Sequence, residues 1–399
     1  MKRPIAVPIV LSAITALLII TSCETNNNDP IDPGTSTTEL LSKRVSDPPQ
    51  IDGIIEAVWD ESQVLMTETV VPSVDFDNYQ GYVGDGTEVK IRSMYDGTFI
   101  YFLAEWKDGK QDASRETWYF DPADKNWKQE SRYPQFDQDG NKIREPFYED
   151  KFAMLYNIDN SVVGWNTASC YASCHSVPEE QKVRHYTREG EFIDMWHWKS
   201  VRTEPNGQID DQYQSYVEGG GNGRHSDDKM SGGYSNNIQT LTVTGTSEDV
   251  SVPLYYIPER GSYFWITQEE IDNFVAKKIT AVDSDGVLSV EGGGIINPNT
   301  ENKYQRDGEA VGIFGIPSIY TAKLSGSRGD ISSSASYTGE GWILEFKRKL
   351  TVDSSIGVNG DKQDVDFGSL EDQVFGIGVF DNAAIAHSIK PGLLLRFEE

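Results

Sequence analysis

One stretch near the middle of the chain carries two thiols followed directly by an imidazole: Trp165-Asn-Thr-Ala-Ser-Cys170-Tyr-Ala-Ser-Cys174-His175. Two thiols can form thioether bonds to the vinyl groups of a haem, and the adjacent imidazole can then bind the iron as proximal ligand. The common form of this motif has two residues between the cysteines, whereas residues 171–173 separate them here. The wider loop keeps both thioethers and the ligand, so the stretch predicts covalent haem attachment through Cys170, Cys174 and His175.

Two other chemistries use the same side chains. Cys170 and Cys174 could form a disulfide in an exported protein, with His175 taking no part. A zinc site is a weaker alternative, because no second Cys/His pair at metal-ligand spacing occurs elsewhere in the chain. Haem is favoured because the chain holds three cysteines and the third, Cys23, has a separate explanation.

Residues 1–22 have the pattern of a targeting segment. Lys2 and Arg3 give a positive start, and residues 5–20 form an apolar run that is short for a membrane span. The run ends in Ile20-Thr21-Ser22-Cys23, which resembles the lipobox of bacterial lipoproteins. We therefore predict a lipoprotein signal peptide and lipidation of Cys23, which anchors the protein stably to a membrane. Ordinary secretion, with Cys23 as a leftover thiol, is the alternative.

Charge and composition restrict the partners. Residues 23–44 are expected to be a polar tether, because the stretch from Cys23 to Thr38 is turn-rich and has little to bury. The formal net charge of the whole chain is −28. Such a surface repels nucleic acid and anionic lipid headgroups, so neither is an expected partner. It suits an exported protein that docks a basic redox partner.

The remainder, residues 45–399, shows short apolar alternation broken by Gly, Asp and Asn, which is typical of strands and turns. The clearest example is a hairpin of residues 88–95 and 98–106, with Asp96-Gly97 as a two-residue turn. Helical periodicity is scarce, and residues 268–277 are the best candidate. We predict an all-β fold, a β-sandwich with long loop insertions and few short helices. Further strands are expected at residues 151–157, 240–245, 341–346, 374–380 and 393–397.

One region differs in texture from the rest of this domain. Residues 201–336 are rich in Gly, Ser, Asn and Asp. We interpret them as a loop-rich insert in the sandwich, not as a separate domain. Some of these loops are expected to cover a bound group.

Several segments occur in the order of a known family: Ile51–Trp59, Ile91–Asp108, Tyr148–Met154, Cys174-His175, Asp194–Lys199, Gly341-Trp342 and Gly378–Ala383. They resemble the ethylbenzene-dehydrogenase-related haem-binding domain, the γ-subunit type found with molybdenum enzymes of the dimethyl-sulfoxide-reductase class. The resemblance covers most of residues 45–399, with the insert matched least well. It implies a β-sandwich that holds one haem and passes electrons to or from a redox partner, a molybdenum oxidoreductase or another cytochrome.

The resemblance also bears on the ligands of the iron. The γ-subunits bind haem b through Met and Lys, whereas this chain has thiols and a His, so it resembles the c-type branch. The family's late axial ligand falls near residues 380–388, where His387 is the match; a structural, hydrogen-bonded His is its alternative. His197, flanked by two tryptophans, is the second candidate, followed by Met154 and Met195. The remaining histidines lie in charged or glycine-rich stretches and are expected to be solvated: His185 and His225.

Electron transfer is the favoured function, because two strong axial ligands block access of a substrate to the iron. A haem enzyme would need a distal acid–base group, and the Arg-His pair nearest the motif, Arg184-His185, lies in a charged stretch that is expected to be solvated. The alternative from another class is a carbohydrate-binding β-sandwich lipoprotein, since the opening Asp52-Gly53 to Trp59 also resembles such domains. We expect an exported bacterial lipoprotein with one covalent haem c, a non-enzymatic carrier or accessory subunit facing the periplasm or the cell surface.

Overall fold

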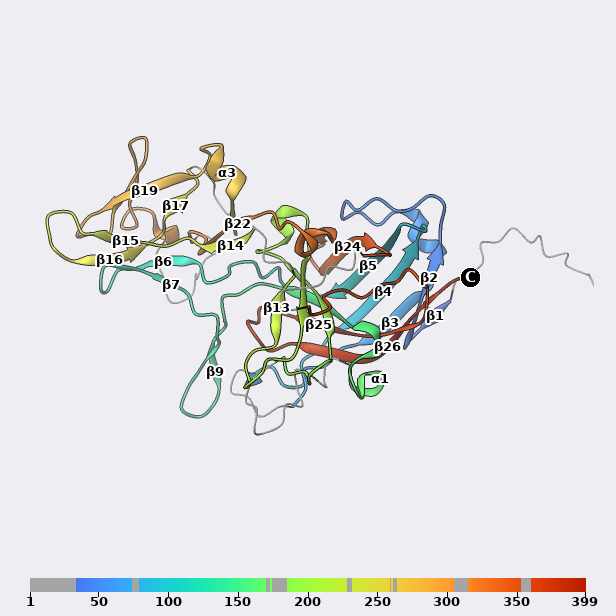
Figure 1. Ribbon diagram of the computed structural model, residues 1–399. Coiled ribbons are helices and arrows are strands. Elements are labelled where there is room, and N and C mark those ends of the chain that lie inside the picture. Colours follow the sequence, from blue (N-terminus) through green and yellow to red (C-terminus); the bar gives the residue numbers. More distant parts are fainter. Residues whose placement is uncertain are drawn as a thin grey trace, which may run out of the picture. The chain divides into compact units, whose positions relative to one another are not determined.

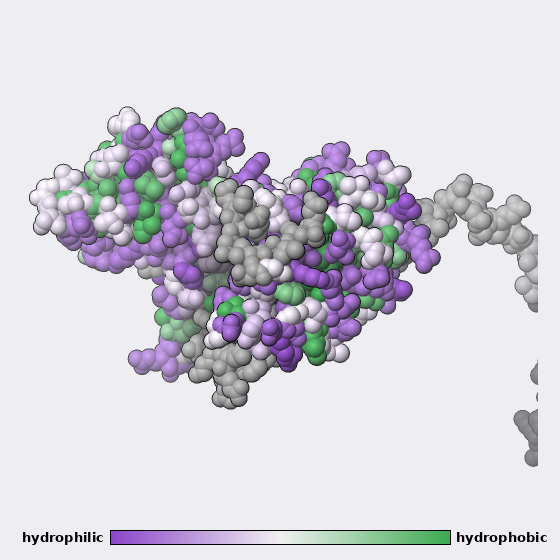
Figure 2. Space-filling view, viewed as in Figure 1, coloured by the Kyte–Doolittle hydropathy of each residue, from purple (hydrophilic) through white to green (hydrophobic). Residues whose placement is uncertain are grey.

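Strands make up most of the regular structure in the computed structural model (Figure 1). The structure describes residues 34–73, 79–169, 173, 185–227, 232–258, 260, 264–304, 315–352 and 360–399. Hydrophilic residues cover most of the face seen in Figure 2, and the hydrophobic residues on it are scattered. This surface agrees with a chain in which 25% of the residues are charged.

The main sheet contains thirteen strands of the described residues: β1 (Thr35–Ser36), β2 (Glu39–Arg44), β3 (Val64–Glu68), β4 (Glu88–Tyr95), β5 (Phe99–Lys107), β10 (Lys151–Asn157), β11 (Ile193–Lys199), β12 (Asp210–Gln214), β13 (Arg224–Ser226), β23 (Ser332–Tyr337), β24 (Gly341–Lys349), β25 (Gln373–Phe380) and β26 (Ser388–Phe397). Their order is β13-β12-β11-β10-β25-β26-β2-β4-β5-β24-β23, with β3 paired to β4 and β1 to β3.

One hydrophobic core joins the two halves of this sheet. Phe102 of β5 meets Trp196 of β11 edge-on, with ring centroids 5.8 Å apart. Trp106 of β5 stacks on Phe152 of β10 at 5.4 Å. The sheet therefore folds over so that its halves face each other, which confirms the predicted all-β sandwich. We call the face that packs on this core the inner face and the opposite one the outer face.

The smaller sheets have a second hydrophobic cluster of their own, which includes Trp118, Trp127 and Ile279. This cluster draws on residues before the expected insert as well as within it. Conversely, β12, β13 and β23 lie within residues 201–336 but belong to the main sheet. The smaller sheets are β14-β22-β18 (Gly233–Asn236, Ile319–Ala322, Ile266–Thr267), β15-β16 (Gln239–Thr242, Asp249–Val252), β17-β19-β20-β21 (Tyr255–Tyr256, Lys277–Val282, Leu288–Val290, Gly294–Ile296), β6-β7 (Trp118–Asp121, Asn126–Gln129) and β8-β9 (Gln135–Phe136, Lys142–Arg144).

The described helices are short, as predicted. The helix expected at residues 268–277 is α3 (Gln268–Asp272), which begins with a capping box of Thr267 and Glu270 and is followed by Phe274 at φ +58°. No described helix has the length and apolar character needed to span a membrane. The others are α1 (Trp165–Ala168) and the 3-10 helices η1 (Ala57–Glu61), η3 (Ile158–Asn160), η4 (Glu204–Asn206), η5 (Asn302–Tyr304) and η6 (Ser327–Gly329).

Each strand named in the sequence analysis is present, as β4, β5, β10, β15, β24, β25 and β26. The turn between β4 and β5 is displaced by one residue from the prediction. The Asp96 N–H donates to the Phe99 carbonyl at 3.1 Å, so Gly97 and Thr98 are the central pair. Gly97 has φ +90°, which fits the first central position of a type II′ turn. Asp96 instead accepts hydrogen bonds from the turn through its carboxylate.

The tether prediction was wrong for residues 39–44. This segment is β2, which pairs in parallel with both β26 and β4 in the interior of the main sheet. Leu40 is fully buried in the core, and the polar residues beside it point away. A short strand whose two neighbours are more than 40 residues away in sequence carries little local signal, so its polar composition was misleading.

Candidate functional site

The outer face of β10 and β11 is covered as completely as the inner face. Every residue of β10 and of β11 is buried. Successive side chains alternate between the two faces, and the pairing of Ala153 with both His197 and Gly378 places these residues together on the outer side. The apolar members of this face form a distinct cluster: Ala153, Leu155, Val162, Trp165, Ile193, Met195, Phe380 and Ile389.

Small residues make this face hollow beside His387. A Cβ added to Gly378 would lie only 3.2 Å from His387 Cδ2, so glycine leaves room for the ring. A cavity of about 50 Å³ lies here, with mainly apolar lining that includes Leu155, Met195 and Ile389. The hollow could therefore take part of a flat apolar group.

Cys170, Cys174 and His175 lie outside the described residues, as does Cys23. The neighbours of the motif are described, and they attach to the outer face. Trp165 Nε1 donates to the Val374 carbonyl at 2.8 Å, just before the cysteines. The Ser169 hydroxyl donates to the Phe375 carbonyl at 3.2 Å and accepts from the Gly392 N–H at 2.8 Å.

Of the three residues between the two cysteines, Ser173 has a described position. Ser173 is buried, and its carbonyl accepts from the Tyr186 N–H at 3.0 Å. The next residue back, His185, accepts through its carbonyl from the Gly223 N–H at 3.2 Å, in the loop between β12 and β13. Ser169 is thus hydrogen-bonded to β25, and Ser173 to the residue that follows His185.

His387 is half-buried, and its ring stacks on Phe380 with centroids 4.4 Å apart. Its Nδ1 lies 2.8 Å from the Ile385 carbonyl. A carbonyl only accepts, so in the neutral ring Nδ1 carries the hydrogen and the lone pair is on Nε2. This is the tautomer of a histidine that coordinates a metal through Nε2.

His197 has the opposite arrangement. Its Nδ1 lies 2.8 Å from Arg224 Nη2, and a guanidinium only donates. Nδ1 therefore accepts, and Nε2 of the neutral ring carries the hydrogen. Nε2 is buried and has no hydrogen-bond partner. Burial, together with Lys199 and Arg224, lowers the pKa of His197 well below its usual value. His197 is thus a neutral imidazole with a spare donor.

A cavity of about 310 Å³ adjoins these two histidines and is lined by cationic and aromatic side chains. Arg115, Arg202 and Arg224 reach it from separate parts of the chain, and Tyr148 and Tyr234 supply ring faces to Arg115 and Arg202. In a chain of net charge −28, such a local excess of positive charge marks a place for an anionic ligand.

Lys151 is the least compensated of these cations. It is 2% exposed, and its Nζ donates to the Ala384 carbonyl at 3.1 Å and lies 3.9 Å from the centre of the Phe380 ring. No ion pair of Lys151 is found among the described residues. Burial, and secondarily Arg202, lowers its pKa well below the usual value. An anion in the cavity would restore the charged form.

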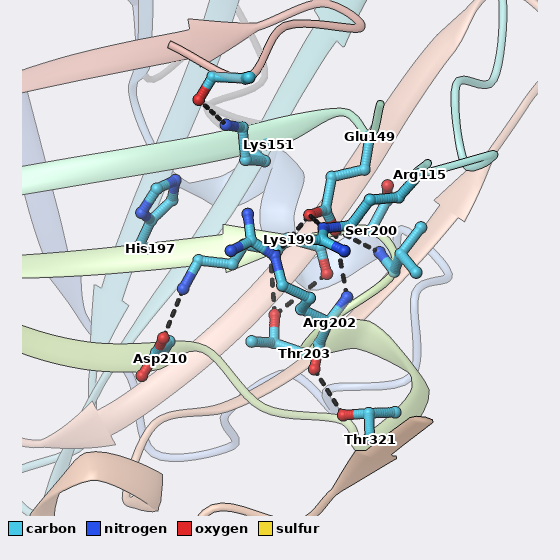
Figure 3. Close-up of polar contacts among 12 residues, drawn as sticks. Arg115, Glu149, Lys151, His197, Lys199, Ser200, Arg202, Thr203, Asp210 and Thr321 are labelled. Atoms are coloured by element: carbon cyan, nitrogen blue, oxygen red, sulfur yellow. Dashed lines mark hydrogen bonds and ion pairs between the residues drawn. The ribbon is translucent and has the colours of Figure 1, made fainter. Parts of the chain in front are cut away.

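Glu149 compensates the two arginines on the far side of the cavity (Figure 3). Its carboxylate accepts from Arg202 Nε at 2.5 Å and lies 3.5 Å from Arg115 Nε, and it also accepts from the Val201 N–H. Burial alone would raise the pKa of Glu149, but Arg202 and Arg115 hold it below the usual value. Nearby, Lys199 pairs with Asp210, which Arg328 also contacts at 2.6 Å.

The other histidine and methionine candidates fall at different places. His185, expected to be solvated, is half-buried and lines both cavities. His225, also expected in a solvated loop, lies in β13, where pairing with β12 brings its ring to 5.0 Å from Tyr213. Met195 is on the outer face, whereas Met154 packs in the main core on the inner face.

The cationic residues were missed in the sequence analysis. Arg115, Glu149 and Arg202 come from connections far apart in the chain, so no local motif joins them. A signal was present at Lys151 and Lys199, each of which stands at one end of a strand in which most other residues are apolar or aromatic. A charge so placed needs a buried partner or a ligand.

The fold and the site together define an all-β sandwich whose outer face has an apolar hollow, two histidines and a cationic pocket. The ethylbenzene dehydrogenase family matches residues 56–391, and the chain belongs to that family. Membership fits a subunit that works in electron transfer with an oxidoreductase. A search of curated proteins finds no match.

Among solved structures, the chain is similar to a carbohydrate binding module of family 9 from Caldicellulosiruptor kristjanssonii. With glucose bound, that structure shows 8% identity, a TM-score of 0.28, and coverage of 90% of this chain and 94% of that one. With cellotriose bound, the values are 9%, 0.28, 90% and 93%. A TM-score this low carries no argument about the ligand of this chain.

Glu149→Gln is expected to lower the free energy of unfolding by about 3–5 kcal/mol at pH 7, because Arg202 loses its counter-charge and Arg115 keeps only that of Glu116. Because the pKa of Glu149 is lower in the folded than in the unfolded state, its ionised form stabilises the fold at pH values above the ordinary pKa. This stabilisation is lost as the pH falls through the lowered pKa. The difference between wild type and variant should therefore narrow below pH 4.5, the ordinary value for Glu. Urea unfolding of both proteins at pH values from 7 to 3 measures this difference in the free energy of unfolding.

The exposed Glu340 provides the control, since Glu340→Gln should change stability by no more than about 0.5 kcal/mol. If Glu149→Gln is as stable as the wild type at pH 7, the carboxylate does not compensate the two arginines.

Proposed function

We propose that the protein is a membrane-anchored, exported c-type cytochrome that carries electrons through one haem. Cys170 and Cys174 hold the haem covalently, and His175 is the proximal ligand. One observation carries this proposal: Ser169, which directly precedes Cys170, is hydrogen-bonded to the Phe375 carbonyl and the Gly392 N–H beside the outer face that holds His387 and the cavities. The sequence motif therefore begins next to this face.

The residues of the outer face fit the chemistry of haem. A porphyrin has an apolar ring and two propionate carboxylates at one edge. The hollow lined by Leu155, Met195 and Ile389 would take part of the ring. The adjoining cationic cavity, with Arg224 and Lys151, suits the carboxylates. This match of an apolar region with a cationic edge supports haem over a neutral ligand.

His387 is the better candidate for the sixth ligand. Its hydrogen bond to the Ile385 carbonyl favours the tautomer with the lone pair on Nε2 and orients the ring. His197 would have to give up the hydrogen bond from Arg224 in order to present a lone pair at Nε2. The spare Nε2–H of His197 suits a carboxylate oxygen in the cationic cavity instead.

The remaining tasks belong to the protein surface and to the anchor. Haem, when bound, supplies a one-electron couple at its iron. Two axial imidazoles leave no open position, so the protein acts as a carrier or as an accessory subunit and not as an enzyme. Family membership makes an oxidoreductase the natural partner, either a molybdenum enzyme or one linked through another cytochrome. The acidic surface would dock a basic patch on that partner.

The first test is covalent attachment. Wild-type protein matured in a host with a c-haem assembly system should keep its haem on a denaturing gel, because thioether bonds survive unfolding. The variant with Cys170→Ala and Cys174→Ala should lose it. The ratio of haem stain to protein stain on the same gel measures the haem retained per chain. Wild-type protein without stain would refute the proposal, whereas Cys23→Ser, matched in chemistry, should stain like wild type.

The second test separates the two histidines. His387→Ala should open the sixth position, shift the absorption spectrum from low spin to high spin, and let carbon monoxide bind the reduced protein. His197→Ala should do neither, because Arg224 holds its Nδ1 as an acceptor. If the two variants behave the other way round, His197 is the ligand. If neither changes the spectrum, Met195 is tested next.

The third test concerns localisation. Lipidated Cys23 would anchor the chain through several buried acyl chains, so the wild type should sediment with membranes. Cys23→Ser should move most of the protein to the soluble fraction, with haem staining unchanged. Fractionation and immunoblotting measure the distribution. Unchanged membrane association of the variant would show that another element provides the anchor.

A further inference from the structure

The inner face of the same strands carries carboxylates that the haem site does not use. Asp194 of β11 and Asp211 of β12 are fully buried, and Asp364 joins them from the segment before β25. Each offers one oxygen, and these oxygens all lie within 4.8 Å of one another. Buried carboxylates at this spacing repel one another unless positive charge lies between them.

Arg348 supplies one positive charge and no more. It extends from β24 and is fully buried, and its guanidinium lies over the Trp196 ring. It contacts Asp194 Oδ2 at 3.0 Å and Asp364 Oδ1 at 2.6 Å. Asp211 Oδ2 is 3.9 Å from it, beyond hydrogen-bond distance. One guanidinium therefore faces three carboxylates and leaves the third without a hydrogen bond from it.

A fourth carboxylate gives an independent indication of a missing cation. Asp227 is fully buried, and neither of its carboxylate oxygens has a hydrogen-bond partner among the described residues. Its N–H donates to the Asp211 carbonyl at 3.3 Å. The register that pairs Ser226 with Gln212 sets Asp227 opposite Asp211 and directs both side chains to the same face. A buried carboxylate without any donor is costly unless a ligand satisfies it.

We propose that Asp194, Asp211, Asp227 and Asp364 form a buried divalent-cation site, with Ca²⁺ as the best fit. The donors are all oxygen, which disfavours Zn²⁺. Ca²⁺ takes oxygen ligands at about 2.3–2.6 Å, so oxygens on opposite sides of it lie roughly 4.6–5.2 Å apart. The oxygens of Asp194, Asp211 and Asp364, all within 4.8 Å of one another, are compatible with this spacing. The ion would link β11 and β12 to the segment before β25.

A second group of carboxylates has similar spacing, but hydrogen-bond donors of the protein satisfy its buried member. The oxygens of Asp108, Asp150 and Asp381 also approach one another within 4.8 Å. Asp150 Oδ2, however, accepts from the Asp112 N–H at 2.7 Å and from Trp342 Nε1 at 3.1 Å, and its Oδ1 accepts from the Asn382 N–H. Donors of the protein satisfy that carboxylate, and Asp381 is exposed. This group serves as the control.

The experiment uses the full mature chain, dialysed first against EDTA and then against trace-metal-free buffer. Metal analysis after re-addition of Ca²⁺ should give one Ca²⁺ per chain, and the thermal unfolding midpoint should rise with Ca²⁺ concentration. Asp227→Asn and Asp211→Asn should raise the Kd for Ca²⁺ at least tenfold. Asp381→Asn should leave it unchanged. Asparagine resembles the protonated carboxyl, so the metal-free variants should still fold.

Two results would overturn the inference. The first is wild-type protein that retains no Ca²⁺, Mg²⁺ or Mn²⁺ and whose unfolding midpoint none of them moves; the cluster then holds protons. The second is equal loss of Ca²⁺ affinity in Asp381→Asn, which would place the ion at the other group. None of these readouts uses haem, so failure here and failure of the proposed function are distinguishable.

Discussion

The structure depends on strands that are buried on both faces. Along β10 and β11 no residue reaches solvent, so each side chain must find a partner on one face or the other. The inner face meets this demand with stacked aromatic rings such as Trp196 and Phe152. The outer face meets it with a smaller apolar cluster and with charged groups. A sheet with one face exposed to solvent would need buried partners on its other face only. Here both faces are covered, and the two cavities lie among the groups that cover the outer face.

On the outer face, the balance of buried charge decides what the site can bind. Glu149 offsets Arg202 and Arg115, and Asp210 offsets Lys199, but Lys151 has no carboxylate at ion-pair distance in the described structure. An unpaired buried cation is expensive, and the chain lowers the cost by lowering its pKa. The Nε2–H of His197, which has no hydrogen-bond partner among the described residues, also requires an acceptor. An anionic group of a ligand satisfies both at once, whereas a neutral sugar would satisfy only the imidazole.

Much of the fold could be predicted because its signals are local. The alternation in β4 and β5 and the glycine at Gly97 lie within a few residues of each other, and the hairpin follows. The position of His387 on the site face came from resemblance to the family. Strand β2 was not recognised, since its partners lie at residues 93–95 and 394–397. The cationic pocket was missed for the same reason: its members meet only once the register of the sheet is known.

The register of β11 on β12 puts each buried charge on the face that holds its partner. Lys199 of β11 and Asp210 of β12 meet on the outer face, whereas Asp194 and Asp211 share the inner face with Arg348. A slip of one residue along β11 would place His197 and Lys199 among the aromatic rings of the core, and it would part Lys199 from Asp210 and Asp194 from Arg348. Breaking a buried ion pair costs about 3–5 kcal/mol, because it leaves a buried charge uncompensated. The polar pattern therefore specifies the pairing together with the apolar pattern, and the arrangement of both faces follows from that pairing.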